Sequence, residues 1–368
     1  MLRSVEVEYW VIDDEGRLTE PGDLTDASAG AEREFVEPLL EIKTTPCETT
    51  AELRDELLGR VGRVLRRAED TDRGLVPLGT PVLEEDIRQL PCDRTRVQNR
   101  AVGNSFEYVR HCAGTHVHVE QEPGHEVDQL NTLTALDPAL ALVNSSPYFR
   151  GRRTAVGARS KIYRWMAYDR LPRQGRLWSY SEDTKDWDRR LREGYEAFLE
   201  AAKEAGVSAE AVEDNFTPES AVWTPVKLRE TFSTVEWRSP DNAVPSQVLR
   251  LADDVVSVVE TAVGCGVSVE GKKGRVTDEA VVLPEYRDLK KYVEEAILEG
   301  ISSEDLRSYL ERMGFDTEEY EPVTGEVDSG GSVTKEEARR LRKEHADRLR
   351  TDVQRAASVG SDRIRTKG

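Results

Sequence analysis

Residues 114–120 read GTHVHVE, and their alternation of polar and apolar side chains decides how the fold is predicted. Successive side chains of a β-strand point to opposite faces, so Val117 and Val119 share one face of such a strand. The other face carries polar side chains: His116, His118 and Glu120. We therefore predict a strand whose apolar face packs on a core and whose polar face is available for another use.

The same alternation recurs in three further stretches of the chain. Residues 4–10 read SVEVEYW, residues 38–44 read PLLEIKT and residues 228–238 read LRETFSTVEWR, and we predict a strand in each. Their polar faces carry charged side chains: Glu6 and Glu8, Glu41 and Lys43, and Glu236 and Arg238. Solvent explains the polar face of a single strand, but glutamate is uncommon in strands, so four such faces indicate a shared site.

Helices separate these strands along the chain. Apolar residues recur with helical spacing in four segments: 50–69, 126–143, 188–205 and 246–263. A further buried strand is predicted at residues 74–82, which read GLVPLGTPV. Strands and helices interleave without the regular rhythm of a doubly wound sheet. The predicted fold class is therefore α+β, with a mostly antiparallel sheet flanked by helices.

The composition limits the partners of the protein. Its 368 residues include 71 Asp and Glu against 52 Lys and Arg, which gives a net charge of −19. An acidic surface repels the phosphates of nucleic acids and anionic membranes, so neither is expected as a partner. Only 12 of the basic residues are Lys and 40 are Arg, a composition that indicates adaptation to high salt. The alternative is an ordinary acidic cytosolic protein.

Cysteine usage and hydropathy favour a cytoplasmic location. The four cysteines form no CxxC pair and no regular spacing, which suits a reducing compartment. Met1 leads directly into a predicted strand, and the apolar stretches are far shorter than the ~20 residues that cross a bilayer.

The C-terminal end differs from the rest in charge. Residues 332–368 contain 11 Lys and Arg against 6 Asp and Glu, and a single helix is predicted from about Thr334 to Ala357. We therefore divide the chain into a main domain, 1–325, and a basic helical tail, 326–368. The tail either docks on its own acidic domain or is an arm for nucleic acid or a protein partner.

Carboxylates gathered in one site favour a hard divalent cation. They raise one another's pKa unless a cation compensates their charge. Mg²⁺ binds through one or two carboxylates and completes its coordination with phosphate oxygens and water, so the pattern indicates a site for nucleotide phosphates. The sequence GVSVEGKK at 266–273 nearly matches a phosphate-binding loop, but Lys273 stands where that loop needs a hydroxyl.

The order of the motifs resembles that of a known family. After the acidic first strand come LExxT at 40–44, GTHVHV at 114–119, NSSPxxxG at 144–151 and TVEWRxxD at 234–241. This series resembles the glutamate–cysteine ligase type 2 family, also called carboxylate–amine ligases, from about Ser4 to Gly264. The resemblance implies a glutamine-synthetase-like fold whose concave antiparallel sheet holds ATP and Mg²⁺, with 1–325 as the catalytic domain. Together with the acidic composition, it implies the enzyme of an extreme halophile.

Site residues are carried over from the family position by position. The resemblance implies these metal ligands: Glu6, Glu8, Glu41, His116 and Glu236. It implies that Arg238 and Arg159 are catalytic and bind ATP by neutralising phosphate charge. The chain departs from the family pattern at Ser4, Val7 and Glu120, which puts finer substrate contacts in doubt.

The resemblance also implies a reaction. The γ-carboxylate of L-glutamate is joined to L-cysteine through a γ-glutamyl phosphate, giving γ-glutamylcysteine, ADP and phosphate for thiol metabolism. The cofactors are ATP and Mg²⁺, or Mn²⁺ in its place, and a homo-oligomer is compatible with the sequence. The alternatives are a carboxylate–amine ligase with a different amine and a non-catalytic relative that binds amino acids or nucleotides.

Overall fold

A computed structural model describes residues 1–365, so residues 366–368 of the predicted tail lie outside the described residues. Within the described chain, the largest sheet has seven strands, in the order β2-β3-β1-β5-β9-β8 with β4 paired to the far end of β1. All of its pairs are antiparallel. The strands are β1 (Arg3–Asp13), β2 (Ala31–Arg33), β3 (Leu39–Lys43), β4 (Arg73–Val76), β5 (Thr115–Glu120), β8 (Val226–Arg229) and β9 (Thr234–Trp237).

The register of this sheet brings the predicted polar faces side by side. On β1, Glu8 lies opposite Glu41 of β3, and Glu6 lies opposite His116 of β5. On the next pair of strands, His118 lies opposite Glu236 of β9. The polar residues of four separate stretches therefore share one face of the sheet.

The apolar face of the sheet packs on three long helices: α1 (Thr50–Asp70), α3 (Glu126–Leu136) and α8 (Pro245–Cys265). Fully buried valines of β1 and β5 belong to the same hydrophobic cluster as Leu57 and Val61 of α1 and Val255 of α8. Burial of each such side chain contributes about 1.5–3 kcal/mol, so this packing fixes which face of the sheet points away from the core.

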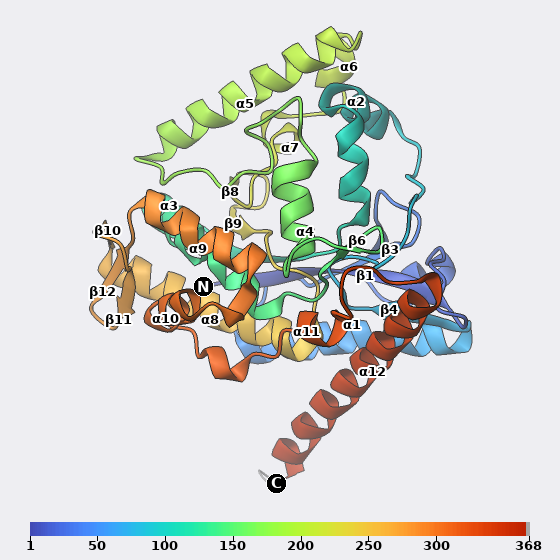
Figure 1. The fold of residues 1–368 in the computed structure, drawn as a ribbon. Coiled ribbons are helices and arrows are strands. Elements are labelled where there is room, and N and C mark those ends of the chain that lie inside the picture. Colours follow the sequence, from blue (N-terminus) through green and yellow to red (C-terminus); the bar gives the residue numbers. More distant parts are fainter. Residues whose placement is uncertain (366–368) are drawn as a thin grey trace.

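The polar face is covered by a different set of elements. These are α2 (Asp93–Val102), α4 (Ala158–Lys161), α5 (Thr184–Glu204), α6 (Ala209–Glu213) and α7 (Pro218–Ala221). Figure 1 shows α2, α4, α5 and α7 on one side of the sheet and α1 and α8 on the other. A separate hydrophobic cluster, which includes Phe106, Tyr168, Phe198 and Trp223, holds this cover together. The cover and the sheet enclose the region in which the polar side chains meet.

Smaller elements complete the chain beside the core helices. They are a hairpin of β6 (Tyr148–Phe149) and β7 (Arg152–Arg153), a sheet of β10 (Val267–Val269), β11 (Arg275–Thr277) and β12 (Ala280–Leu283), and the helices α9 (Tyr286–Leu298), α10 (Glu304–Arg312) and α11 (Thr324–Val327). Buried residues of α9 and α10 belong to the main hydrophobic cluster.

The described part of the predicted tail forms helix α12 (Lys335–Arg365), which docks on the acidic domain (Figure 1). Leu341 belongs to the same hydrophobic cluster as Trp10, and Leu349 belongs to the main core. Arg342 is 2% exposed and donates to the carbonyl oxygens of Gly16 at 3.2 Å and Pro81 at 2.9 Å. The division of the chain into 1–325 and 326–368 stays a prediction.

The α+β fold with an antiparallel sheet and flanking helices is confirmed, but some element boundaries were predicted wrongly. Residues 228–238 are not one strand: β8 and β9 form a hairpin, and Ser233 in its turn has φ = +51°. The strand expected over 74–82 ends at Val76, before Pro77. The helix expected over 126–143 ends at Leu136, and Pro138 follows in a 3₁₀ segment because proline cannot continue an α-helix. Among the described residues, no helix is both long and apolar enough to cross a membrane.

Candidate functional site

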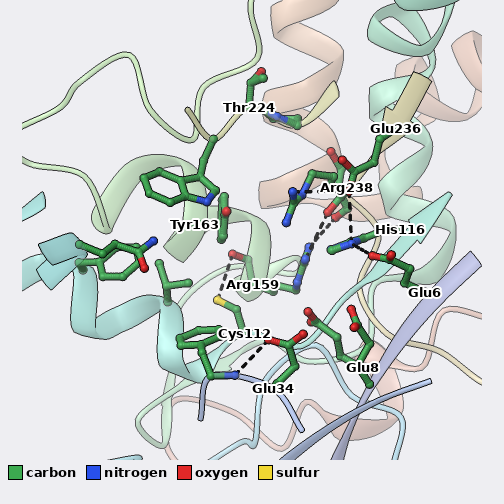
Figure 2. Close-up of a pocket in the computed structure, with 18 of the residues that line it drawn as sticks. Glu6, Glu8, Glu34, Cys112, His116, Arg159, Tyr163, Thr224, Glu236 and Arg238 are labelled. Carbon is green, nitrogen blue, oxygen red and sulfur yellow. Dashed lines mark hydrogen bonds and ion pairs between the residues drawn. The ribbon is translucent and has the colours of Figure 1, made fainter. Parts of the chain in front are cut away.

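A cavity of about 500 Å³ lies over the polar face of the sheet. Its floor comes from β1, β3, β5 and β9, and its walls come from α2, α4 and the loops around them. Every site residue predicted from the sequence lines it: Glu6, Glu8, Glu41, His116, Arg159, Glu236 and Arg238. Figure 2 shows Glu6, His116 and Glu236 pointing toward one another inside this cavity.

Among residues 1–365, the side chains that could bind a metal ion form two groups rather than one. The first, which we name the histidine group, contains Glu6, His116, His118 and Glu236. The second, the carboxylate group, contains Glu8, Glu34 and Glu41. Within each group, one ligand atom per residue lies within 4.8 Å of the others. Two ions close to one another, rather than a single ion, would be needed to occupy all predicted ligands.

Close contacts connect the histidine group. His116 Nδ1 lies 2.8 Å from Glu6 Oε2 and 3.4 Å from Glu236 Oε1. His118 Nε2 lies 3.7 Å from Glu6 Oε1 and 3.8 Å from Glu236 Oε1. Burial, followed by the charge of Arg238, lowers the pKa of His116 to about 4, so its imidazole is neutral near pH 7. A neutral imidazole is the form that binds a metal ion.

Two atoms of the histidine group are buried without a hydrogen-bond partner in the described part of the chain: His118 Nε2 and Glu236 Oε1. An unsatisfied buried polar atom costs about 1–3 kcal/mol, so such a pair indicates a missing partner between them. These residues therefore fit a divalent cation. Mg²⁺ takes oxygen ligands and imidazole is a ligand of first-row transition metals, so a set of two imidazoles and two carboxylates suits a first-row cation such as Mn²⁺ better than Mg²⁺.

The carboxylate group has a different electrostatic character. Burial raises the pKa of Glu8 to about 7, that of Glu34 to about 7 and that of Glu41 to about 8, and repulsion within the group adds to each shift. Compensation comes from Lys43, whose Nζ lies 2.7 Å from Glu41 Oε2, and from the Gly114 N–H, which donates to Glu8 Oε2 at 2.5 Å. An all-oxygen donor set of this kind fits Mg²⁺.

The sequence predicts a raised pKa for crowded carboxylates unless cations compensate their charge, and the carboxylate group shows this rise. Burial acts in the same direction on Glu6, but hydrogen bonds and charge interactions with His116 and His118 outweigh it and lower its pKa. Burial also acts to raise the pKa of Glu236, but Arg238 and its other cationic neighbours outweigh burial and lower that pKa, as expected for a compensated carboxylate. One of these cationic neighbours is Arg229, whose Nη1 lies 2.7 Å from Glu236 Oε2.

The two predicted arginines lie side by side in the cavity (Figure 2). Arg238 follows β9, and its Nη1 lies 3.5 Å from Glu236 Oε1. Arg159 projects from α4 and donates to the carbonyl oxygens of Ser239 at 2.9 Å and Arg238 at 3.2 Å. Its guanidinium lies so close to Gly114 that a Cβ there would be 2.0 Å from Nη2. Glycine at 114 therefore makes room for Arg159.

Sequence reasoning missed two of the ligand candidates. His118 shares a strand face with His116, so the alternation of GTHVHVE contained the signal. Glu34 follows the three-residue strand β2, and no periodicity of the sequence marks it. Only the pairing of β2 with β3 brings Glu34 beside Glu41.

Away from the acidic groups, the cavity is lined by aromatic side chains. They include Phe35, Phe106, Tyr163, Tyr168 and Trp223. The rings of Tyr168 and Trp223 are stacked at a centroid distance of 6.1 Å and an interplanar angle of 21°. The cavity therefore joins an apolar region, suited to a flat or apolar group, to a charged region suited to phosphates.

Comparisons with solved structures establish the fold. A bifunctional glutathione synthetase from Pasteurella multocida has a TM-score of 0.52 at 13% identity, covering 96% of this chain and 52% of that one. A glutamate–cysteine ligase from Francisella tularensis, solved in complex with AMP, has a TM-score of 0.55 at 13% identity, covering 100% and 93%.

Comparisons of sequence establish the family. A provisionally named glutamate–cysteine ligase 2-1 from Rhodococcus jostii (strain RHA1) is 30% identical over 182 residues, 47% of this chain and 48% of that protein. A provisionally named glutamate–cysteine ligase 2 from Chloroflexus aggregans (strain MD-66 / DSM 9485) is 29% identical over 187 residues, 47% and 46%. The chain thus spans about half the length of these curated relatives. A family model matches residues 5–265, and the chain belongs to glutamate–cysteine ligase family 2.

Proposed function

We propose that the protein is an ATP-dependent glutamate–cysteine ligase that produces γ-glutamylcysteine. One observation carries the proposal: two groups of candidate metal ligands, the buried Arg159 and the partly buried Arg238 converge in a single cavity on the sheet. The family and the AMP complex of a structural neighbour support it. The composition supports a cytoplasmic enzyme that works at high salt, where its product serves as a thiol.

The residues of the cavity fit transfer of a phosphoryl group. The histidine group would hold Mn²⁺ or Mg²⁺ and the carboxylate group would hold Mg²⁺; cations bound there would neutralise the negative charge of ATP phosphates. Arg238 and Arg159 would bind and orient the transferring phosphate, because both line the cavity, Arg159 fixed by its hydrogen bonds to two backbone carbonyls and Arg238 placed beside Glu236. The walls position glutamate, the amine and ATP together, which lowers the entropic barrier.

The bonds formed and broken balance without a protein nucleophile. The γ-carboxylate of glutamate attacks the γ-phosphorus of ATP, and ADP leaves. The amine of cysteine then attacks the acyl phosphate, loses a proton and displaces inorganic phosphate. The enzyme has to align these groups and stabilise their charges, which is what a cavity lined by acids, imidazoles and arginines can do.

The direct experiment measures ADP release by purified protein in molar KCl with Mg²⁺ or Mn²⁺. We expect release that requires both L-glutamate and L-cysteine and yields γ-glutamylcysteine. A panel of amino acids tests the amine. Release with glutamate but without preference for cysteine would overturn the cysteine assignment and support a ligase for another amine. Nucleotide binding without turnover under all these conditions would support a non-catalytic relative instead.

A further inference from the structure

Asp137 is a fully buried carboxylate that lies outside the cavity lining, at the junction of α3 and the 3₁₀ segment Asp137–Val143. Arg164 donates to it twice, from Nη1 to Oδ2 at 2.6 Å and from Nη2 to Oδ1 at 3.0 Å. The indole N–H of Trp237 donates to Oδ1 at 3.0 Å, and the hydroxyl of Ser239 donates to the same oxygen. One carboxylate therefore binds the residues that precede and follow Arg238.

Ser239 connects this carboxylate to the arginines of the cavity. Its hydroxyl accepts from Arg164 Nη2 at 2.7 Å while donating to Asp137. Its carbonyl oxygen accepts from Arg159 Nη1 at 2.9 Å, and Arg159 Nη2 reaches the carbonyl oxygen of Arg238 at 3.2 Å. Arg159 and Arg164 thus bind the backbone and side chain of residues 238 and 239, and the same contacts fix the backbone from which the Arg238 side chain projects.

Two of the arginines in these contacts come from one helical segment, residues 158–166. Arg159 lies in α4, and Arg164 lies in the π-helical turn Ile162–Met166 that follows it. Both side chains are about 95% buried and both line the cavity. π-Helical turns occur mainly as local departures at functional sites, which fits a segment that aims two arginines at one strand end.

Stability alone does not account for a buried ion pair of this kind. Desolvation of two charges offsets most of their attraction, and apolar residues of similar volume are often equally stable in such places. Fixing the direction in which a guanidinium group points is a requirement separate from stability. A guanidinium that has to meet a phosphate must be held to within a fraction of an ångström, because a misplacement of about 1 Å can cost about 100-fold in rate.

We propose that Asp137, Arg164 and Ser239 form a positioning network that sets the directions of the Arg238 and Arg159 guanidinium groups. This inference rests on the proposed function, since it assumes that these two arginines bind the transferring phosphate. None of the three is needed as a reacting group.

Ser239→Ala tests the network because it removes one hydroxyl and leaves the backbone carbonyl that binds Arg159. We expect kcat to fall by about 10- to 100-fold while the KM for L-glutamate changes less than about threefold. The affinity for a non-hydrolysable ATP analogue with Mg²⁺, measured by calorimetry, should fall about three- to tenfold.

Ser303→Ala is the matched control. Ser303 is also buried, its hydroxyl donates to Glu295 Oε2 at 2.7 Å and accepts from the backbone of Leu306 at 3.2 Å, and it lies in neither the cavity nor the network. Both variants should lose a similar amount of stability in urea unfolding. Only Ser239→Ala should lose turnover and analogue affinity.

A double-variant cycle separates positioning from a general structural effect. In an Arg238→Lys background one of the two guanidinium groups that the network aims is gone, and Ser239→Ala keeps the carbonyl that binds the other, Arg159, so adding Ser239→Ala should lower kcat and analogue affinity less than about threefold further. Additive losses would overturn the proposal, because they would show that Ser239 acts independently of Arg238. Wild-type turnover and affinity in Ser239→Ala would also overturn it, and would leave the ligase proposal intact. A wild-type protein without ligase activity, but with the same non-additive effect on analogue binding, would reject the ligase and retain the network.

Discussion

The histidine group and the carboxylate group lie on the same sheet face, yet the pKa values of their acids shift in opposite directions. In the histidine group, imidazoles and the guanidinium groups of Arg229 and Arg238 compensate the acids, and the pKa values of Glu6 and Glu236 are lowered. In the carboxylate group compensation is incomplete, and all three pKa values are raised. The pairing partners of a carboxylate, rather than its burial, decide whether it stays ionised without a metal ion.

The largest difference between the groups should appear when one acid of each is neutralised. Glu236→Gln should lower turnover by more than about 100-fold, because it removes a ligand candidate and the counter-charge of two arginines. It should also destabilise the protein by roughly 2 kcal/mol, since hydrogen bonds between charged groups are lost. ADP release and urea unfolding measure the two effects.

Glu41→Gln is the matched substitution in the other group. It should also lower turnover, but at pH 8 it should stabilise the metal-free protein, because a carboxylate with a raised pKa opposes folding when ionised. Equal destabilisation by both substitutions would show that the groups do not differ electrostatically.

Gly114→Ala should disturb the cavity where the Gly114 backbone contacts both Arg159 and Glu8 of the carboxylate group. The new Cβ would collide with Arg159, and the Gly114 N–H that binds Glu8 would shift with the strand. We expect turnover to fall by about 10- to 100-fold. Gly62→Ala in α1 is the control, since a Cβ there meets only ordinary contacts, and it should keep full activity. Full activity of Gly114→Ala would remove Arg159 from the site.

The acids of the carboxylate group should lower the stability of the metal-free protein as pH rises from about 5 to 8, whereas His111, His116 and His345, whose folded pKa values are lowered to about 4, act in the opposite direction below about pH 6.5. The acids of the carboxylate group have an ordinary pKa of 4.5 and folded values of about 7, 7 and 8, so in this window the folded state holds more protons than the unfolded state. Each of these three acids then lowers the free energy of unfolding by up to about 1.4 kcal/mol per pH unit. Urea unfolding at pH 6 and 8 measures the loss, which Mg²⁺ should reverse at pH 8. The histidines contribute alike to the wild type and to Glu41→Gln, so the comparison of these two proteins isolates one acid: a difference in stability that does not change between pH 6 and pH 8 would contradict the raised pKa of Glu41.

The smallest expected effect concerns the single lysine that borders the carboxylate group. Lys43 lies 2.7 Å from Glu41 and is partly exposed, so its attraction is screened by solvent. Lys43→Gln should tighten Mg²⁺ binding by about two- to threefold, because a competing cation is removed. Calorimetric titration measures the change, and weaker binding would indicate that Lys43 helps to shape the site instead.

Local alternation predicted the strands and their polar faces because it depends only on neighbouring residues. Glu6, Glu8, Glu41, His116 and Glu236 were placed on one face in this way, and the register brought them together. The division into two groups could not be predicted, since it depends on Glu34 and on which strands are neighbours.

Contacts between segments that are distant along the chain also could not be predicted from the sequence. Asp137 had no distinguishing pattern, although it binds Arg164, Trp237 and Ser239. The docking of α12 was one of two interpretations, because its apolar positions are few and only the fold shows that Leu341 shares a hydrophobic cluster with Trp10.

Mn²⁺ binding to the purified protein tests the central claim, that one sheet face carries two separate cation sites. Titration followed by electron paramagnetic resonance counts the bound ions in the wild type, in Glu236→Gln and in Glu41→Gln. The account predicts two Mn²⁺ ions per chain in the wild type and one in each variant, with the remaining ion held by the other group. A single ion in the wild type that either substitution abolishes would contradict it.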